Sequence, residues 1–171
     1  MHYYGVEGDF NVMVIDMLGP NLEALFQFCD KKMSIKTICM LGSQCVTRME
    51  QLHAKGFMHR DIKPENFLMG VGKKSHICYS IDFGLAKRYV DPKTGKHIQF
   101  KENKGVTGTA RYASLSAQMG NEQSRRDDLE AVGYVLCYLI KGGKLPWIGL
   151  KAKKKEKEQL LIKLKKETTF E

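Results

Sequence analysis

The chain has 171 residues, of which 43% are hydrophobic, and its 28 basic and 19 acidic side chains give a formal charge of +9. This length suffices for one domain with a buried core, and the composition is that of a globular chain rather than a disordered or fibrous one. The longest apolar stretch, from Val132 to Ile140, is too short to span a bilayer. No basic-then-apolar signal pattern stands at the N-terminus. We therefore expect neither a transmembrane segment nor secretion.

The cysteines and histidines, five of each, are scattered along the chain, and no two cysteines form a C-x-x-C pair. An odd number of dispersed cysteines is typical of reduced, buried thiols in a cytoplasmic or nuclear protein, and it gives no indication of structural zinc. The positive charge suits anionic partners, which include phosphates, acidic peptides, nucleic acid and membrane surfaces. A solvated, lysine-rich surface accounts for the charge equally well.

The first third of the chain is expected to form one buried strand followed by two helices. Residues from Asn11 to Met17 are apolar and β-branched, and the run Leu18-Gly19-Pro20 ends this strand. From Asn21 to Asp30 the apolar residues recur on one helical face. Ser34 is then expected to cap a longer helix, which Gly56 closes.

The middle of the chain is expected to alternate short strands with irregular segments. Strands are predicted from Phe67 to Met69 and from Cys78 to Ile81, joined by a turn from Gly70 to Ser75. A long polar loop without regular structure is expected from Asp82 to about Gln123, and loops of that length in compact domains usually bind or regulate. The strongly apolar stretch from Asp127 to Ile140 predicts a helix that is buried on most sides.

The segment His59-Arg60-Asp61-Ile62-Lys63-Pro64-Glu65-Asn66, followed by Asp82-Phe83-Gly84, carries the clearest chemistry. Phosphoryl transfer needs a carboxylate that positions the attacking hydroxyl and accepts its proton, oxygen ligands for magnesium, and positive charge near the γ-phosphate. The sequence offers a residue for each of these roles. Asp61 can be the carboxylate, Lys63 the phosphate contact, and Asn66 and Asp82 the Mg²⁺ ligands.

These two segments match the signature H-R-D-x-x-x-x-N plus D-F-G of protein kinases, in the same order. D-F-G alone is a weak signal, whereas the eight-residue loop with its fixed spacing is a strong one. The alternative is a pair of surface turns with solvated carboxylates, but a turn does not require Arg, Lys and Asn at these positions. The sequence therefore predicts an ATP- and Mg²⁺-dependent kinase.

More closely, the chain resembles the casein kinase I family of serine/threonine kinases. Lys63, two residues after Asp61, is typical of serine/threonine kinases rather than tyrosine kinases. The resemblance covers nearly the whole chain and weakens after Ala152. The segments that carry it are Gly5–Val14, Leu18–Glu23, Asn66–Gly70, Gly108–Ser114, Glu122–Glu130 and Leu145–Lys151.

The resemblance implies an α+β, protein-kinase-like fold, in which residues 1–171 form a partial kinase domain. Residues 1–17 would be a remnant of the small-lobe sheet, and residues 18–171 the mainly helical large lobe, truncated at its C-terminal end. It also implies an ATP pocket with Ile15 at its back, backbone groups of Asp16 and Leu18 facing adenine, and Leu68 and Ile81 as its apolar floor. The alternative for Leu68 and Ile81 is simple core packing.

The resemblance also implies that Asp128 holds the backbone of the catalytic loop, which agrees with the need of a buried carboxylate for hydrogen-bond donors. The alternative is that it only favours the dipole at the start of a helix.

Casein kinase I enzymes favour acidic or already phosphorylated protein substrates, and the resemblance assigns anion recognition to Arg111, Gly149 and Lys151. Arginine suits this role because its planar fork pairs two phosphate oxygens. One departure from the family falls on this site. Where the family has a lysine, the ungapped alignment places Glu158, with Lys157 beside it.

No G-x-G-x-x-G loop and no Val-Ala-Ile-Lys-type lysine precede Asn11. Such groups hold the ATP phosphates from above, so their absence leaves the activity of these residues alone open, and a non-catalytic binding module is the alternative function. The lysines from Lys151 to Lys166 are compatible with a nucleic-acid or membrane-surface patch, but they are more typical of a solvated helix face. Nucleic acid is therefore not an expected partner, and the protein is expected to be a monomer.

Overall fold

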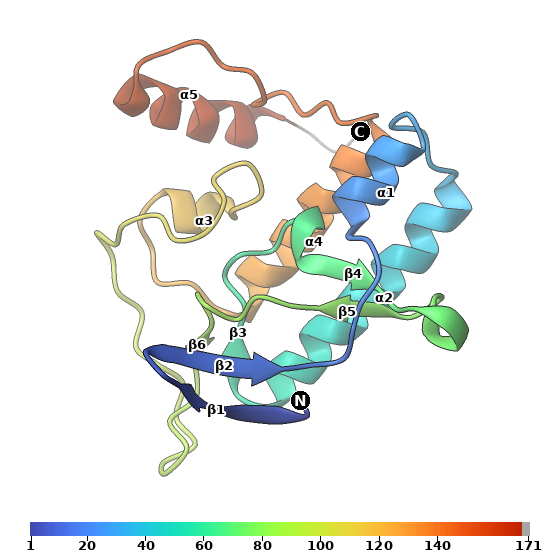
Figure 1. The fold of residues 1–171 in the computed structure, drawn as a ribbon. Helices are drawn as coiled ribbons and strands as arrows, with labels where there is room; N and C mark the ends of the chain where they lie inside the picture. Colours follow the sequence, from blue (N-terminus) through green and yellow to red (C-terminus); the bar gives the residue numbers. More distant parts are fainter. Residues whose placement is uncertain (169–171) are drawn as a thin grey trace.

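The computed structural model describes residues 1–168, without the side chain of Lys154. Five α-helices and three small antiparallel sheets make up the described part of the chain, which confirms the expected α+β class (Figure 1). The helices are α1 (Leu22–Phe28), α2 (Ile35–Ala54), α3 (Leu115–Gln118), α4 (Arg125–Ile140) and α5 (Lys154–Glu167). The strands are β1 (Tyr3–Glu7), β2 (Phe10–Val14), β3 (Phe57–Met58), β4 (Phe67–Met69), β5 (Cys78–Ser80) and β6 (Lys87–Arg88).

Helices α2 and α4 pack against each other at the centre of the helical body (Figure 1). Gly42 of α2 makes the close approach possible, because a side chain there would meet Leu136 of α4. Burial of apolar side chains along this contact is the main stabilising contribution in the fold. The core it belongs to includes Leu22, Phe26, Ile38, Met49, Phe67, Tyr112, Val135, Leu139 and Trp147.

Helix starts follow from local capping groups. The Oγ of Ser34 accepts a hydrogen bond from the backbone N–H of Thr37, which confirms the predicted N-cap of α2. Helix α4 begins at Arg125 and not at the expected Asp127. The reason is a capping box, in which Ser124 and Asp127 satisfy each other's backbone N–H groups.

Two strand pairings bring the predicted catalytic segments to the same end of the fold. Strand β3 pairs with β6, and β4 pairs with β5, both antiparallel. The loop from His59 to Asn66 connects β3 to β4, and the turn from Asp82 to Gly84 lies between β5 and β6. Because the connected strands are partners in the two sheets, both connections lie side by side.

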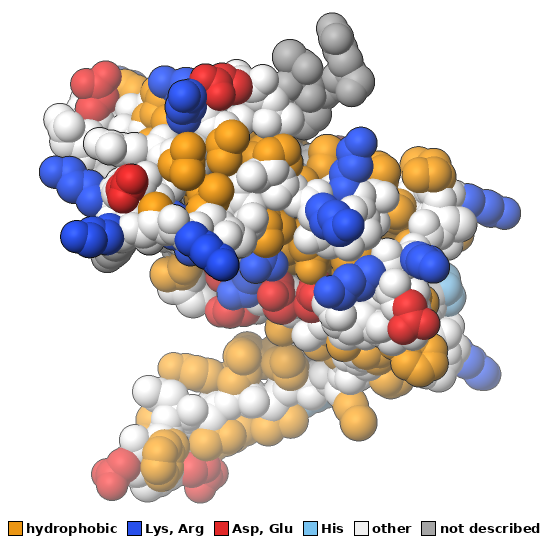
Figure 2. Space-filling model, turned by 90° about the horizontal axis from the view of Figure 1, so that it is seen from above, with side chains coloured by type: hydrophobic (Ala, Val, Ile, Leu, Met, Phe, Trp, Pro, Cys, Tyr) orange, Lys and Arg blue, Asp and Glu red, His pale blue; other side chains and the backbone are white. Residues whose placement is uncertain are grey.

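The N-terminal strand differs from its prediction. It ends at Val14 and not at Met17, and it pairs only with β1, so the expected buried strand is wrong. A two-stranded hairpin has two open edges, and within residues 1–168 no third strand pairs with either of them. Figure 1 shows the two strands of the hairpin, and Figure 2 shows hydrophobic side chains along the narrow arm that they form. Its exposed side chains include Tyr4, Val6, Phe10 and Met13.

The long segment from Asp82 to Gln123 is more ordered than expected, because it contains β6 and α3. Buried Glu122 orders part of it by accepting contacts from Lys87 at 2.7 Å and from Lys104 at 3.0 Å. The expectation of buried cysteines is also wrong in part, since Cys29, directly after α1, and Cys39, on α2, are exposed. No helix in the described part of the chain has the length and apolarity needed to cross a membrane.

Candidate active site

The loop between β3 and β4 is held in an unfavourable backbone conformation by one carboxylate. Arg60 has a φ of +67°, a left-handed conformation that is uncommon for residues other than glycine. Asp128 of α4, only 2% exposed, accepts hydrogen bonds from the backbone N–H groups of His59 and Arg60, both at 2.9 Å. The predicted contact of Asp128 with the loop backbone is thus confirmed, and it fixes the residue just before Asp61.

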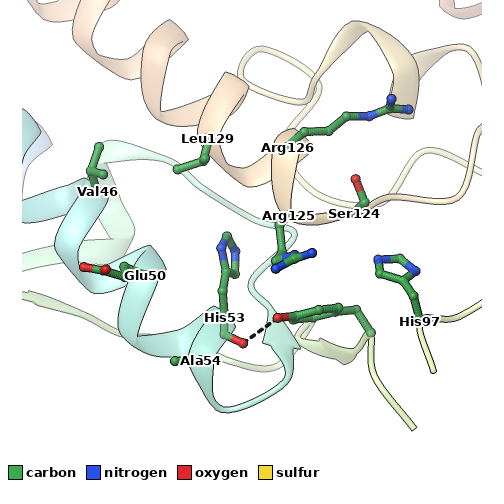
Figure 3. A pocket seen from close by; sticks show the side chains of 10 residues that line it. Val46, Glu50, His53, Ala54, His97, Ser124, Arg125, Arg126 and Leu129 are labelled. Carbon is green, nitrogen blue, oxygen red and sulfur yellow. Dashed lines mark hydrogen bonds between the residues drawn. The ribbon is translucent and has the colours of Figure 1, made fainter. Parts of the chain in front are cut away.

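His53 completes the anchor from α2. Its ring Nε2–H donates to Asp128 at 2.8 Å. Its backbone carbonyl accepts a hydrogen bond from the hydroxyl of Tyr89 at 2.7 Å, drawn as a dashed line in Figure 3. A hollow of about 760 Å³ lies beside His53, between α2, the start of α4 and Tyr89. None of the predicted catalytic side chains lines this hollow, so it is separate from the site built around Asp61.

The ring of His59 joins the two catalytic segments. Its Nε2–H donates to the carbonyl of Ile81 at 2.9 Å, and its ring stands 5.4 Å from that of Phe83. His59 is fully buried, so this contact is shielded from water. Ile81, which precedes Asp82, is therefore held against His59, which lies two positions before Asp61.

The carboxylate of Asp61 is surrounded by hydrogen-bond donors. Lys63 Nζ approaches Oδ2 at 2.7 Å, while the backbone N–H and the hydroxyl of Thr109 donate to Oδ1 at 2.9 and 2.8 Å. Burial alone would raise the pKa of Asp61, but the hydrogen bonds from Lys63 and Thr109 outweigh it and lower the pKa overall. Asp61 is therefore ionised at neutral pH and held in one orientation.

Lys63 remains a cation for the same reason. Its hydrogen bond to Asp61 raises its pKa, against the opposing effect of burial, and the charges of Glu65 and Asp82 act in the same direction. This places a fixed positive charge beside the carboxylate of Asp61.

Asn66 and Asp82 present the oxygen atoms that Mg²⁺ prefers. Asn66 donates through Nδ2 to the backbone carbonyl of Asp61 at 2.9 Å, which leaves its Oδ1 as a free acceptor. Asp82 is exposed, and its Oδ1 receives only a long 3.3 Å contact from the backbone N–H of Gly84. Within residues 1–168 no group of three His, Cys, Asp or Glu side chains could hold a metal by itself. The amide and carboxylate oxygens therefore fit an ion that takes its other ligands from water and phosphate.

The residues expected around adenine are only partly brought together. Leu68 lies on β4 opposite Tyr79 of β5, and Ile81 directly follows β5, where its N–H donates to the backbone carbonyl of Asn66. Leu18 precedes Gly19, whose N–H donates to Met69 of β4, so it reaches the same sheet. Ile15 and Asp16 are exposed in the connection after β2, where Asp16 accepts a hydrogen bond from His2 at 3.0 Å. No hydrogen bond among the described residues joins them to Leu68 or Ile81.

Gly108 makes the contact of Thr109 with Asp61 possible. Its φ is +90°, and a Cβ at this position would overlap the backbone carbonyl oxygen of Arg60. The segment can therefore approach the catalytic loop only when residue 108 has no side chain.

Replacing Gly108 with Ala is expected to destabilise the protein by about 2–4 kcal/mol, because it adds the steric overlap to the strain of a positive φ. Gly95→Ala is the matched control, since Gly95 also has a positive φ, of 67°, but a Cβ there would meet no atom within 4 Å. Urea denaturation of both variants measures the difference. Equal losses in the two variants would show that the contact of residue 108 with Arg60 contributes nothing.

The structure brings two of the three predicted anion-binding residues together in one pocket and leaves the third outside it. Arg111 and Gly149 line one pocket of about 340 Å³, and a second basic side chain in its lining is Lys157 of α5. Lys151 is exposed and is not among its lining residues, and Glu158 lines a different pocket. Lys157, and not Glu158 at the position aligned with the family's lysine, therefore supplies the second positive charge of this pocket. Glu65 contributes one negative charge to the same pocket.

Three residues that contribute to the site were not predicted from the sequence. Thr109 gave a signal, because it lies in the family-like segment that begins at Gly108, but its bond to Asp61 depends on the folded loop. Lys157 was visible only as a neighbour of Glu158. His53 gave no signal, since its contact with Asp128 joins residues 75 positions apart.

The protein kinase domain family model matches residues 2–171, which is nearly the entire chain. The site described above accounts for that match: one ionised carboxylate beside a fixed lysine, an amide and a carboxylate with free oxygens, and a loop held by a buried aspartate. On the match and on this geometry together, the chain belongs to the protein kinase family.

Proposed function

We propose that this chain is a serine/threonine kinase of the casein kinase I type, which phosphorylates acidic or already phosphorylated proteins with ATP and Mg²⁺. The observation that carries this proposal is the position of the Arg111–Lys157 pocket. Thr109 hydrogen-bonds to Asp61, and Arg111, two residues later, lines the pocket. An anionic group on a substrate would thus bind close to the carboxylate that receives its hydroxyl.

In this proposal Asp61 orients the serine or threonine hydroxyl and accepts its proton as the oxygen attacks the γ-phosphorus. The hydrogen bonds from Thr109 and Lys63 hold the carboxylate in place before the substrate arrives, which reduces the entropy lost on reaching the reactive geometry. Lys63 also offers positive charge to the transferred phosphoryl group. The presence of lysine two residues after Asp61 supports serine/threonine rather than tyrosine as the acceptor.

Nucleotide binding would use the residues after β2 and on β4 and β5. Ile15, Asp16 and Leu18 would line the adenine end, with Leu68 and Ile81 beneath the ring. Asn66 and Asp82 would hold Mg²⁺, which supplies charge neutralisation for the ATP phosphates. In this division residues 1–17 belong to the small lobe and residues 18–171 to the large lobe. We further propose a monomer that acts in the cytoplasm or nucleus.

Anion selectivity gives a direct test of the pocket. Arg111→Gln is expected to weaken binding of a phosphoserine peptide by about 10- to 100-fold, because a hydrogen bond to a charged group contributes about 1.5–3 kcal/mol. Lys157→Gln should have a smaller effect in the same direction, since an ammonium pairs phosphate as a point charge. Fluorescence anisotropy with the phosphorylated and unphosphorylated peptides measures both.

Glu158→Gln is the matched control, because Glu158 follows Lys157 on α5 but lines another pocket. Its affinity for the phosphoserine peptide should stay within twofold of the wild type. A larger change at residue 158 than at residue 157 would assign the anion site to the aligned position and would contradict the proposed pocket.

A second function, a binding module without catalysis, is favoured by the sequences of β1 and β2, which contain no lysine to hold ATP phosphates. The two functions differ in one observable. A kinase transfers radiolabelled phosphate from Mg²⁺-ATP to casein, whereas a binding module retains phosphopeptide affinity and transfers none.

A further inference from the structure

Lys165 of α5 is buried although lysine is rarely found inside proteins. Its exposure is 6%, whereas Lys163 and Lys166 on the same helix are exposed. A partner carboxylate does not explain this placement, because none of the ion pairs among the described side chains involves Lys165.

Aromatic rings and backbone carbonyls surround the ammonium group. Nζ lies 4.5 Å from the centre of the Tyr134 ring and 5.1 Å from that of Trp147, and these two rings pack edge to face. It donates to the backbone carbonyl of Ala113 at 2.5 Å and has a longer contact with that of Ala110 at 3.3 Å. Aromatic faces and carbonyl oxygens both favour a cation.

The two carbonyls belong to the segment that carries Arg111. Between them, the indole N–H of Trp147 donates to the carbonyl of Arg111 at 2.8 Å. At the start of the segment, Thr109 is bound to Asp61. The backbone from residue 109 to residue 113 is therefore fixed at one end by the catalytic carboxylate and at the other by Lys165.

The side chain of Arg111 depends on this backbone for its direction. Its guanidinium lies over the rings of Tyr112 and Tyr138, at 5.7 and 5.8 Å, and no carboxylate in the described part of the chain forms an ion pair with it. A shift of the segment would therefore move the guanidinium within its pocket without breaking a salt bridge.

We propose that Lys165 is a positioning residue for anion selectivity: by holding the carbonyls on both sides of Arg111, it keeps the guanidinium aligned with Lys157 for a phosphoserine or acidic side chain of the substrate. This inference rests on the proposed function of the Arg111–Lys157 pocket. Lys165 itself touches no substrate, since its ammonium is enclosed by Tyr134, Trp147 and the segment that it holds.

The test compares Lys165→Met with the wild-type chain, and uses a fluorescent phosphoserine peptide and its unphosphorylated twin. Methionine retains the apolar stem but cannot donate to the carbonyls. We expect the affinity for the phosphorylated peptide to fall at least tenfold and that for the twin to change less than twofold. A role in folding alone would lower both affinities together or neither. Lys166→Met, one residue further on the exposed face, should match the wild type.

The outcomes separate this inference from the function on which it rests. If the wild type does not prefer the phosphorylated peptide, the anion pocket is wrong, and this inference is wrong with it. If Arg111→Gln loses the preference but Lys165→Met keeps it, only the positioning role is overturned. Should Lys165→Met fail to fold, Lys165→Gln replaces it, because its shorter amide side chain cannot reach both carbonyls. Trp147→Phe removes the indole donor to the Arg111 carbonyl. An unchanged preference of this variant for the phosphorylated peptide would likewise contradict the proposal that this backbone segment must be held in place.

The acid–base behaviour of Lys165 gives a second readout. Burial lowers its pKa to about 7, opposed by the charge of Glu130 on α4, whereas burial raises the pKa of Tyr134 and Tyr112, which stay neutral. Above pH 7 the lysine keeps its proton in the unfolded chain but releases it in the folded chain. The stability of the wild type should therefore rise from pH 7 to 9 relative to that of Lys165→Met. The unfolding equilibrium constant should fall by up to tenfold per pH unit. Parallel pH profiles would show that Lys165 is not enclosed and would overturn the proposal.

Discussion

Replacing Asp61 with Asn is expected to lower kcat for phosphoryl transfer by about 10²- to 10⁴-fold, the usual contribution of a positioned general base. Asparagine has nearly the same shape, and its oxygen can still accept a hydrogen bond from Thr109, so the loop should remain folded. What it lacks is a basic oxygen to receive the proton of the substrate hydroxyl. The measurement is the initial rate with Mg²⁺-ATP and casein, at saturating concentrations of both.

Two controls make this result specific. Asp9→Asn changes an exposed carboxylate in the β1–β2 turn and should leave the rate unchanged. The melting temperature of Asp61→Asn should stay close to that of the wild type. An Asp61→Asn variant with the wild-type rate would show that the proton goes elsewhere, and the role assigned to Asp61 would have to be abandoned.

Removal of the Asp128 carboxylate is expected to have the largest effect on stability, a loss of about 3–5 kcal/mol in Asp128→Ala. The carboxylate is 2% exposed and accepts three hydrogen bonds, from the ring of His53 and from the backbone of His59 and Arg60. Alanine would leave these donors buried and unpaired and would release the left-handed conformation of Arg60. Because a domain is stable by only about 5–15 kcal/mol, much of the protein would unfold.

Chemical denaturation separates this account from a simple effect on the helix dipole. A carboxylate that acts only through the dipole contributes about 0.3–1 kcal/mol. Asp128→Asn should lie between the wild type and Asp128→Ala, since its amide oxygen can still accept from part of the donor set. A loss below about 1 kcal/mol in Asp128→Ala would favour the dipole explanation.

Features encoded in short segments could be predicted from the sequence. The spacing from His59 to Asn66 identified the catalytic loop, because its charged and amide residues have separate roles in phosphoryl transfer. Helical periodicity and the N-cap at Ser34 located α2, because capping depends on neighbours only three residues away. The role of Asp128 followed from the family resemblance, because its position at the start of an apolar helix favours only an interaction with the helix dipole.

Features that depend on distant packing could not be predicted. The pattern of β2 records that its residues are apolar, but it does not record what covers them, so the exposed hairpin was unexpected. Lys157 and Glu158 are adjacent in the sequence, yet neighbours on a helix point about 100° apart, so the register of α5 decided which one lines the pocket with Arg111. The burial of Lys165 among otherwise exposed lysines depends on Tyr134 and Trp147 in the same way.

The most direct test of the central claim, that this chain is a serine/threonine kinase with a preference for acidic substrates, is phosphoamino-acid analysis of casein after incubation with the chain, Mg²⁺ and radiolabelled ATP. We predict label in phosphoserine and phosphothreonine, and none when Asp61→Asn replaces the wild type. Label in phosphotyrosine, or no label with the wild-type chain, would contradict the account.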